Sequence, residues 1–558
     1  MTDPTPPSPG GHVRRLSVPL SPFWTGEIKS FPTSDEKKAE DDDNEAIGSP
    51  RVSSRGIIEV PMTEIAFFPL PMDDAASDER ALLPENRPSR TGISSSRLLS
   101  RVPSVVKATE DQPGEIVDID KTPPISAEPD TTSVSSDTTV ASSSDSVKSE
   151  FSENTAGSIW EDVPMAKPDA ILGIAKEYQQ CTNPRKVNVC VGAYRDENGK
   201  PWVLPSVRQA ERILWEDETQ TKEYLPIDGD REFVQCAMRF AYGPDVPLEH
   251  LAGVQTLSGT GACRVGGTFL AAFWPNHPIY CPNPTWGNHI TIFKECGLDV
   301  RRYRYYDRAN NGLDLSGMLR DLQKAPRGSI ILLHACAHNP TGCDPTIHEW
   351  KQIISMIGQR DHVAFFDCAY QGFASGDAEA DAAPFRYAVS QRVPIVLAQS
   401  FAKNFGLYGE RCGSLSVVCG DAEQKERILS ELRLVIRPMY SSPPRHGSSI
   451  VKTILKDEQL TKQYYEECAS MARRIQRMRT KLVECLSTMS KHDWSHIKRQ
   501  IGMFAFTGLT PDMCHQLTNE YYIFLTTNGR ISIAGLNDSN VEYVANAIHA
   551  VTDGKSMS

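Results

Sequence analysis

The chain has 558 residues, and its formal net charge of −12 lies in one part of the sequence. Residues 1–157 contain 27 acidic and 15 basic side chains, whereas residues 158–558 contain 44 of each kind. The neutral balance of the second part argues against nucleic-acid binding through a basic surface. The apolar runs of the sequence are shorter than the roughly 18–20 residues of a membrane-spanning helix, so we expect no transmembrane segment.

Residues 1–157 have the composition of a disordered extension. They hold 18 of the 39 prolines and none of the 14 cysteines, and the stretches 34–45 and 131–149 are polar and of low complexity. Such a composition cannot bury enough apolar surface to offset the entropy of ordering the chain. We therefore expect residues 158–558 to form the folded part.

The beginning of the sequence does not resemble a leader peptide. Met1 is not followed by the apolar stretch of a secretory signal, and Asp3 and Glu27 interrupt what would be a mitochondrial presequence. The 14 cysteines are scattered, with no CxxC pair and no zinc-like spacing. This pattern indicates reduced thiols inside a cell, and it predicts no metal site.

In chain order, the first element with a possible chemical role is an apolar helix predicted over 265–273. The small residues at 257–262 (LSGTGA) precede it. Backbone N–H groups at the start of a helix can bind an anion, and small residues let that anion approach. Taken alone, however, this stretch fits an ordinary turn better than an anion site.

Three short apolar runs follow, at 330–333, 363–366 and 395–397. Each is continuous rather than alternating, which is typical of strands buried on both faces of a parallel sheet. Each also runs directly into polar residues, at 334–339, 367–370 and 400–403. Because ligands bind beyond the carboxyl ends of the strands in open α/β sheets, we predict an α/β fold with one shared site at this edge.

Near the C-terminus, the sequence predicts a long amphipathic helix. The apolar residues Met471, Ile475, Met478, Leu482 and Cys485 recur at helical spacing. The arginines between them are expected to form a solvated basic face, and they are Arg473, Arg474, Arg477 and Arg479.

A series of long motifs, in order from Ser158 to about Gly554, resembles the aspartate aminotransferases. Residues 400–413 (SFAKNFGLYGERCG) resemble the segment of that family that carries the cofactor lysine. The other matching motifs are VGAYRDENGKPWVLPSVR at 191–208, NPTWGNH at 283–289, HACAHNPTG at 334–342, FFDCAYQGFASGD at 365–377, IRPMYSSPP at 436–444 and GRISIAG at 529–535. Details such as TWGNH and GLYGER are more similar to the mitochondrial type than to the cytosolic type.

The resemblance implies a fold-type-I enzyme that depends on pyridoxal phosphate. Such an enzyme transfers an amino group from L-aspartate to 2-oxoglutarate in a ping-pong reaction through pyridoxamine phosphate, giving oxaloacetate and L-glutamate. It also implies a homodimer with shared active sites. Each subunit would have a large domain with a mostly parallel sheet, at about 203–469, and a smaller α/β domain, at about 169–202 plus 470–555.

By the same resemblance, Lys403 is the Schiff-base lysine and proton shuttle, and Asp367 is the partner of the ring nitrogen. His289 would orient that aspartate, and Asn339 and Tyr370 would donate to the phenolic oxygen and so lower the pKa of the internal imine. Trp286 would stack on the ring. The phosphate group would be held by Ser258, Gly259, Thr260, Ser400, Arg411 and, from the other subunit, Tyr224.

Two arginines are expected to select a dicarboxylate substrate. Arg530 matches the residue that grips the α-carboxylate, and Arg437 matches the one that grips the distal carboxylate from the neighbouring subunit. Gly192 matches a backbone contact to the substrate, and Trp286 and Asn339 are also predicted to contact it. The bonds 283–284 and 339–340 match positions with cis peptide bonds in the family.

Some alternatives stay open at this point. Ser442 and Arg445 differ from the Asn and Leu that the family usually has, which could alter selectivity near the distal end of the substrate. An aminotransferase for aromatic amino acids or kynurenine is the alternative enzyme, and a catalytically idle scaffold is the alternative without activity. The folded part favours a mitochondrial location by resemblance, whereas the lack of a clear presequence favours the cytoplasm.

Overall fold

The structure, a computed structural model, describes residues 160–167, 169 and 171–553. The predicted disordered extension, residues 1–157, therefore lies outside the described residues.

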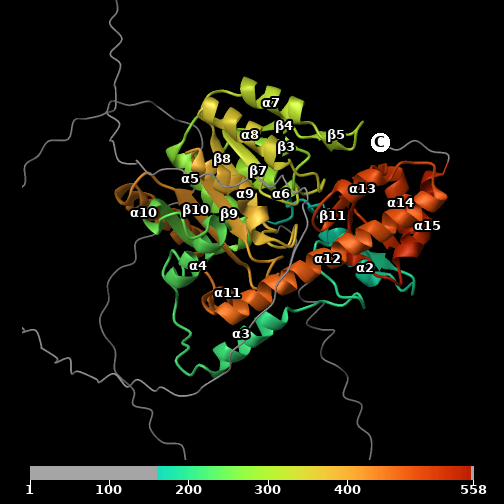
Figure 1. The fold of residues 1–558 in the computed structure, drawn as a ribbon, viewed down its shortest axis with the longest axis horizontal. Helices are drawn as coiled ribbons and strands as arrows, with labels where there is room; N and C mark the ends of the chain where they lie inside the picture. Colours follow the sequence, from blue (N-terminus) through green and yellow to red (C-terminus); the bar gives the residue numbers. More distant parts are fainter. Residues whose placement is uncertain (1–159, 168, 170, 554–558) are drawn as a thin grey trace, which may run out of the picture. The chain divides into compact units, whose positions relative to one another are not determined.

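The centre of the fold is a seven-stranded sheet (Figure 1). Its strands, from one edge to the other, are β2 (Leu251–Leu257), β10 (Cys412–Val418), β9 (Ile395–Ser400), β8 (Val363–Cys368), β7 (Ile330–His334), β3 (Ile279–Asn283) and β4 (Val300–Arg304). The pairs from β9 to β4 are parallel, and β10 runs antiparallel to both of its neighbours. The predicted α/β fold with a mostly parallel sheet is thus confirmed.

The three apolar runs form β7, β8 and β9, which are adjacent in the sheet, as predicted. Alternate residues of these strands enter two separate cores, because successive side chains of a strand point to opposite faces. In β7, Ile330 and Leu332 belong to one core, and Ile331 and Leu333 belong to the other. Burial on both faces explains why these segments are continuously apolar.

Helices cover both faces of the sheet. One face packs against residues of α5 (Ser258–Phe273), α6 (Gly287–Glu295) and α10 (Ala422–Tyr440). The helices that contribute to the core on the other face include α3 (Pro205–Glu216), α4 (Arg231–Tyr242), α7 (Leu315–Lys324), α8 (Ile347–Gln359), α9 (Ala378–Ser390) and α11 (His446–Lys456). The helix predicted over 265–273 begins seven residues earlier than expected, at Ser258, so the small residues form its first turn.

The C-terminal part is mainly helical and lies to the right in Figure 1. Its helices are α12 (Glu458–Met489), α13 (Ser495–Arg499), α14 (Pro511–Tyr521) and α15 (Val541–Thr552), and α2 (Leu172–Gln180) lies nearby. Two small sheets accompany them: β1 (Val187–Asn188) pairs with β12 (Ile523–Phe524), and β11 (Phe504–Phe506) pairs with β13 (Arg530–Ser532). The remaining elements are η1 (Leu248–His250), β5 (Tyr306–Asp307), β6 (Gly312–Leu313) and η2 (Ile533–Gly535).

The long amphipathic helix is confirmed as α12, but the expectation that all of its arginines form a solvated face is wrong. Arg474 and Arg479 are buried. Arg474 Nη2 donates to the carbonyls of Asp196 and Leu536, at 3.0 and 2.9 Å. Arg479 Nη2 donates to Phe504 O at 3.0 Å and also to a second backbone carbonyl. Each guanidinium therefore donates to backbone carbonyls of segments that pack on the helix. The spacing was a usable signal, because Arg474 follows Met471 by three residues and Arg479 follows Ile475 by four, which places both at the borders of the apolar face.

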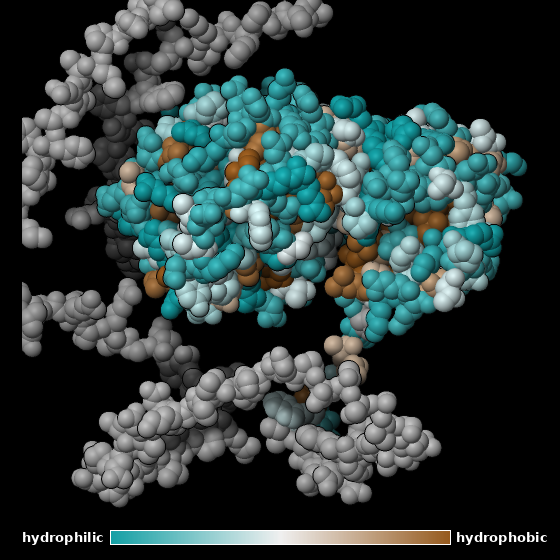
Figure 2. All heavy atoms as spheres, turned by 90° about the horizontal axis from the view of Figure 1, so that it is seen from below, coloured by the Kyte–Doolittle hydropathy of each residue, from teal (hydrophilic) through white to brown (hydrophobic). Residues whose placement is uncertain are grey.

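The face of the described part that Figure 2 shows is mostly hydrophilic, with small hydrophobic patches. Among the helices of the described residues, none is long and apolar enough to span a bilayer.

Candidate active site

A cavity of about 110 Å³ lies at the carboxyl ends of β7, β8 and β9. It brings together most of the residues predicted to bind the cofactor, from segments far apart in the sequence. The predicted residues that line it are Ser258, Gly259, Thr260, Trp286, Asn339, Asp367, Tyr370, Ser400, Lys403 and Arg411. His334, Cys336 and Ala369 complete the lining.

Lys403 follows the end of β9 and is the amine of this cavity. Burial, together with the positive charge of Arg411, lowers the pKa of its ammonium group below the usual value. The nearby Asp367 carboxylate opposes this shift without cancelling it. A lowered pKa makes the neutral amine easier to form, and the neutral amine is the form that acts as a nucleophile or a base.

Asp367 lies near the end of β8 and accepts a hydrogen bond from His289 Nε2 at 3.1 Å. Burial of the carboxylate acts to raise its pKa, but the hydrogen bond from His289 and the electrostatic attraction of the basic groups nearby outweigh it. The net effect is a lowered pKa, so Asp367 is ionised. The cavity therefore holds a fixed negative charge that can stabilise a protonated ring nitrogen.

A chain of hydrogen bonds sets the proton positions behind Asp367. The backbone N–H of Asn339 donates to His334 Nδ1 at 3.3 Å, which leaves the proton of this neutral ring on Nε2. Burial lowers the pKa of His334 to about 3. Thr285 Oγ1 lies 3.0 Å from His334 Nε2 and 3.0 Å from His289 Nδ1. Thr285 thus accepts from His334 and donates to His289, so that His289 carries its Nε2 proton toward Asp367.

One ligand atom each from Cys263, His289 and Asp367 lies within 4.8 Å of the others. The hydrogen bond between His289 and Asp367 accounts for two of these residues. Burial raises the pKa of the Cys263 thiol well above its usual value, and only a thiolate is a good metal ligand. The group is therefore explained by this hydrogen bond and a neighbouring protonated thiol.

The far end of the cavity is built from the first turn of α5 and the end of β9. Ser258 Oγ lies 2.9 Å from Ser400 Oγ, and Ser400 Oγ also accepts from the backbone N–H of Ala402 at 3.2 Å. A Cβ atom at Gly259 would lie 3.1 Å from Ser400 Cβ, so glycine keeps the helix start close to β9. The N–H groups of this first turn and the guanidinium of Arg411 suit a phosphate group.

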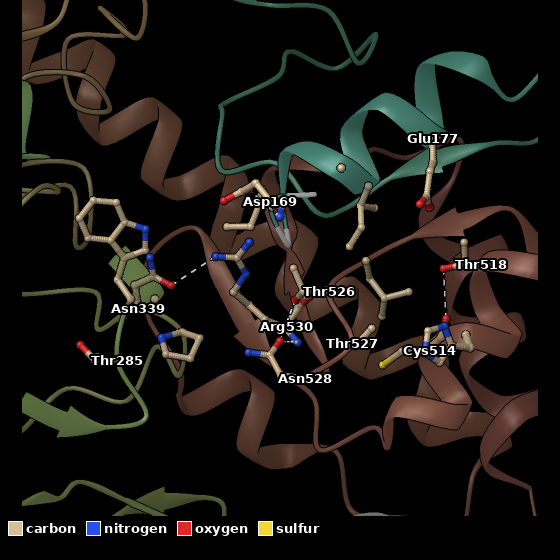
Figure 3. A pocket seen from close by; sticks show the side chains of 18 of the residues that line it. Asp169, Glu177, Thr285, Asn339, Cys514, Thr518, Thr526, Thr527, Asn528 and Arg530 are labelled. Atoms are coloured by element: carbon tan, nitrogen blue, oxygen red, sulfur yellow. Dashed lines mark hydrogen bonds between the residues drawn. The ribbon is translucent and has the colours of Figure 1, made fainter. Parts of the chain in front are cut away.

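Arg530, at the start of β13, is buried next to the cavity, and Figure 3 shows it beside Asn339. Its Nη1 donates to Asn339 Oδ1 at 3.3 Å, and its Nη2 donates to the carbonyl of Cys190 at 2.8 Å. Within the described residues, Arg530 Nε has no hydrogen-bond partner. The guanidinium lies 4.2 Å from the centre of the Phe504 ring, and a Cβ atom at Gly192 would lie 2.7 Å from that ring.

A larger pocket of about 700 Å³ shares Trp286 and Asn339 with the cavity and also has Arg530 in its wall. Its other walls come from the N-terminal part of α2, from α14 and from residues 525–528 (Figure 3). A small molecule could therefore reach Arg530 through this pocket, between α2 and α14.

Tyr224 and Arg437 lie elsewhere on the surface. Tyr224 is 89% exposed and lines a separate groove with Trp215 and Arg445. Arg437 is also exposed, on α10, and donates to Ser441 Oγ at 2.5 Å. Of the predicted site residues, these two are the ones assigned to the neighbouring subunit by resemblance.

The sequence analysis missed Thr285 and His334 as members of the site. His334 ends β7 in the same way that Asp367 lies near the end of β8, so its place at the sheet edge was a usable signal. Thr285 lies inside the NPTWGNH motif, but its link between two histidines depends on a contact 49 residues away along the chain. Both predicted cis peptide bonds, 283–284 and 339–340, are present.

Residues 184–548 match the protein family described as aminotransferase class I and II. This match covers more than half of the chain. The chain belongs to the class I and II aminotransferases. The matched residues include every segment that lines the cavity.

Two curated aminotransferases show how far the likeness extends. The chain is 50% identical to the mitochondrial aspartate aminotransferase of Dictyostelium discoideum, over 72% of this chain and 95% of that protein. It is also 50% identical to the cytoplasmic aspartate aminotransferase of Oryza sativa subsp. japonica, over 71% of this chain and 98% of that protein. The relatives thus include both mitochondrial and cytoplasmic proteins, and membership of the family does not choose between the two predicted compartments.

A solved aminotransferase structure extends the comparison to the fold. The aromatic-amino-acid aminotransferase from Burkholderia pseudomallei, covalently bound to pyridoxal phosphate, is 39% identical to this chain with a TM-score of 0.69. The similarity covers 71% of this chain and 100% of that one. Sequence identity is therefore higher to the two aspartate aminotransferases than to this aromatic one.

Proposed function

We propose that this chain is an aspartate aminotransferase that uses pyridoxal phosphate to transfer the amino group of L-aspartate to 2-oxoglutarate. The observation that carries the proposal is the half-buried Lys403 in one cavity with the ionised Asp367, beside the buried Arg530. The 50% identity to aspartate aminotransferases over nearly their whole length supports the choice of substrate.

The residues of the cavity fit the cofactor. Arg530 Nε is a buried donor without a partner among the described residues, as expected of a group that awaits a carboxylate. The Ser258 and Ser400 hydroxyls, Gly259, Thr260 and Arg411 form a place for a dianionic phosphate. Asp367 would hold the ring nitrogen, Trp286 would stack on the ring, and Lys403 would form the covalent bond.

The chain's own residues then hold and move protons. When bound, pyridoxal phosphate supplies the electron-withdrawing ring that makes the Cα proton of an amino acid removable. His289 keeps Asp367 ionised, and Thr285 and His334 keep the His289 proton on Nε2. Lys403 Nζ, whose pKa is lowered, would accept the Cα proton of the substrate and would be the group that holds and donates it again.

Two hydrogen-bond donors of the cavity would face the phenolic oxygen of the cofactor. Asn339 and Tyr370 would donate to its phenolic oxygen. These hydrogen bonds would lower the pKa of the Lys403 nitrogen in its covalent bond to the cofactor. Burial raises the pKa of the Tyr370 hydroxyl, so this group is a neutral donor at any working pH. These roles rest on the resemblance, and the shared cavity supports them.

Substrate choice would depend on two cationic groups. Arg530 would bind the α-carboxylate through its free Nε and its Nη atoms, near the backbone of Gly192. Arg437 would bind the distal carboxylate in the neighbouring subunit, and Tyr224 would reach the phosphate there. The exposure of both residues supports a homodimer with shared active sites.

We also propose the division into a large domain at about 203–469 and a small domain at about 169–202 plus 470–555. The whole seven-stranded sheet falls within residues 251–418, whereas the β1–β12 and β11–β13 sheets come from the proposed small domain. Helix α12 starts in the large domain and ends in the small one, so it would connect the two.

The test is a rate measurement on the full chain loaded with pyridoxal phosphate. L-aspartate and 2-oxoglutarate should give oxaloacetate and L-glutamate, with parallel lines in double-reciprocal plots. Arg530→Leu should lower kcat/KM about 10²–10⁴-fold, because two charge-assisted hydrogen bonds are lost. Arg301→Leu, which removes an exposed arginine on β4, is the matched control and should retain activity. Equal activity in the two variants would contradict the assignment of Arg530.

A further inference from the structure

The turn after β7 has an unusual backbone conformation at the point where it enters the cavity. Ala337 adopts φ +50°, in the left-handed region that disfavours residues with a side chain. Asn339 comes two residues later, lines the cavity and accepts from Arg530. The position of Asn339 therefore depends on whatever holds Ala337 in this conformation.

The side chain of Asp344 stabilises this conformation of Ala337. One of its carboxylate oxygens, Oδ2, accepts the backbone N–H of Ala337 at 2.6 Å, and the other, Oδ1, accepts that of His338 at 2.8 Å. Two successive N–H groups around a left-handed residue form a concave site for an anion, and the carboxylate occupies it. Two adjacent N–H groups of the turn are thus fixed to one side chain.

The turn after β8 is held in the same way. Asp381, on α9, is buried and accepts the backbone N–H groups of Gly372, Ala374 and Ser375 at 2.8–3.3 Å. Tyr370 begins this turn, because its carbonyl accepts from the backbone N–H groups of Phe373 and Ala374, at 2.9 Å each. The two neighbouring strands therefore each end in a turn that an interior carboxylate closes.

Both carboxylates lack a cationic partner, since no salt bridge to either is formed by the residues that the structure describes. Asp344 keeps some exposed surface, yet burial of its carboxylate raises its pKa to about 7, and burial raises that of Asp381 to about 6. An ionised group in such a place is costly unless backbone donors compensate it. The backbone hydrogen bonds, rather than ion pairs, therefore account for the position of both acids.

We propose that Asp344 and Asp381 are positioning residues, which hold the turns after β7 and β8 and so set Asn339 and Tyr370 toward the cofactor. The inference rests on the proposed function, because it needs those two side chains to donate to the phenolic oxygen. Neither acid touches the cofactor itself. Each acts through a turn that presents one donor.

The test is a pH titration of the visible absorption of the bound cofactor in purified, cofactor-loaded full-length protein. Asp344→Asn replaces one acceptor oxygen by an NH₂ group, which cannot accept from the N–H that faces it. The titration midpoint should rise by about 0.5–1 pH unit, because a weakened hydrogen bond stabilises the ionised phenolic oxygen less. The dissociation constant of pyridoxal phosphate should rise about three- to tenfold. Asp344→Glu keeps both acceptor oxygens and should shift the midpoint less.

Asp381→Asn is the second variant, and it should raise the midpoint through Tyr370 even if Asp344→Asn does not fold. Asp377→Asn is the matched control. Asp377 also accepts two backbone N–H groups, at the exposed start of α9, and asparagine caps a helix equally well, so this midpoint should stay unchanged. Midpoints of the Asp344 and Asp381 variants within 0.1 unit of the parent, with lowered thermal stability alone, would overturn the proposal. Loss of the titration in the parent protein itself would instead contradict the proposed function.

Discussion

Replacing Thr285 by valine tests the hydrogen-bond chain behind Asp367. Valine has nearly the shape of threonine but neither donates nor accepts a hydrogen bond. The change would leave His289 Nδ1 without a donor and His334 Nε2 without an acceptor. Both rings are buried, so neither nitrogen can turn to bulk water instead.

The size of the effect follows from these two lost partners. A buried polar atom without a partner costs about 1–3 kcal/mol, so Thr285→Val should lower the free energy of unfolding by about 2–4 kcal/mol. His289 would also lose the interaction that keeps its proton on Nε2, which faces Asp367. A loss of about 1.4 kcal/mol at Asp367 corresponds to a rise of about one unit in its pKa and to about a tenfold fall in kcat.

The assay combines kcat for L-aspartate with urea unfolding of the same protein. Thr285→Ser keeps the hydroxyl group and is the matched control, which should retain most of both quantities. The serine and valine variants would have to differ in kcat as well as in stability. Equal kcat values for the two variants would refute the idea that the hydrogen bonds through Thr285 and His289 keep Asp367 ionised.

Three further predictions concern single side chains. Lys403→Ala should be purified without the absorption band of covalently bound pyridoxal phosphate, and a normal band would contradict the assignment of this lysine. Arg437→Leu should lose activity on aspartate selectively, with a relative gain on aromatic or aliphatic amino acids, and an equal loss on all substrates would argue against its contact with the distal carboxylate. Because the pKa of Asp344 is raised to about 7 in the folded protein, the native state binds this proton more tightly than the unfolded state, and the stability from this group is lost as the pH rises through about 7. Between pH 8 and pH 6, the parent protein should therefore gain about 1 kcal/mol relative to Asp344→Asn in urea unfolding, whereas a pH-independent difference would show that Asp344 does not titrate there.

Three strands of the central sheet could be predicted because burial on both faces requires a continuous run of apolar residues. Residues 330–333, 363–366 and 395–397 are apolar throughout, and they form β7, β8 and β9. The same pattern indicated which edge of the sheet carries the proposed site, since each run is followed at once by polar residues such as Asp367 and Lys403. The residues with the chemistry therefore lie in short contiguous motifs.

Other features depend on contacts between distant segments and could not be predicted. Arg474 and Arg479 lie three residues after Met471 and four residues after Ile475, at the borders of the apolar face of α12. The backbone carbonyls that accept from them come from distant segments, at 196, 502–504 and 536, and the sequence does not show which segments these are. Thr285 joins His289 to His334 only because α6 follows β3, next to β7 in the sheet.

The sequence by itself therefore determined the type of fold and the strands of the sheet, and it predicted the residues of the proposed site, because each of these depends on a few neighbouring positions. Only the tertiary structure decided which buried groups hold those residues in place. The proton order from His334 to Asp367 and the two turns closed by Asp344 and Asp381 arise from the packing of segments that are separate along the chain. Burial makes the hydrogen bonds of these groups obligatory, and which groups are buried together is a property of the fold.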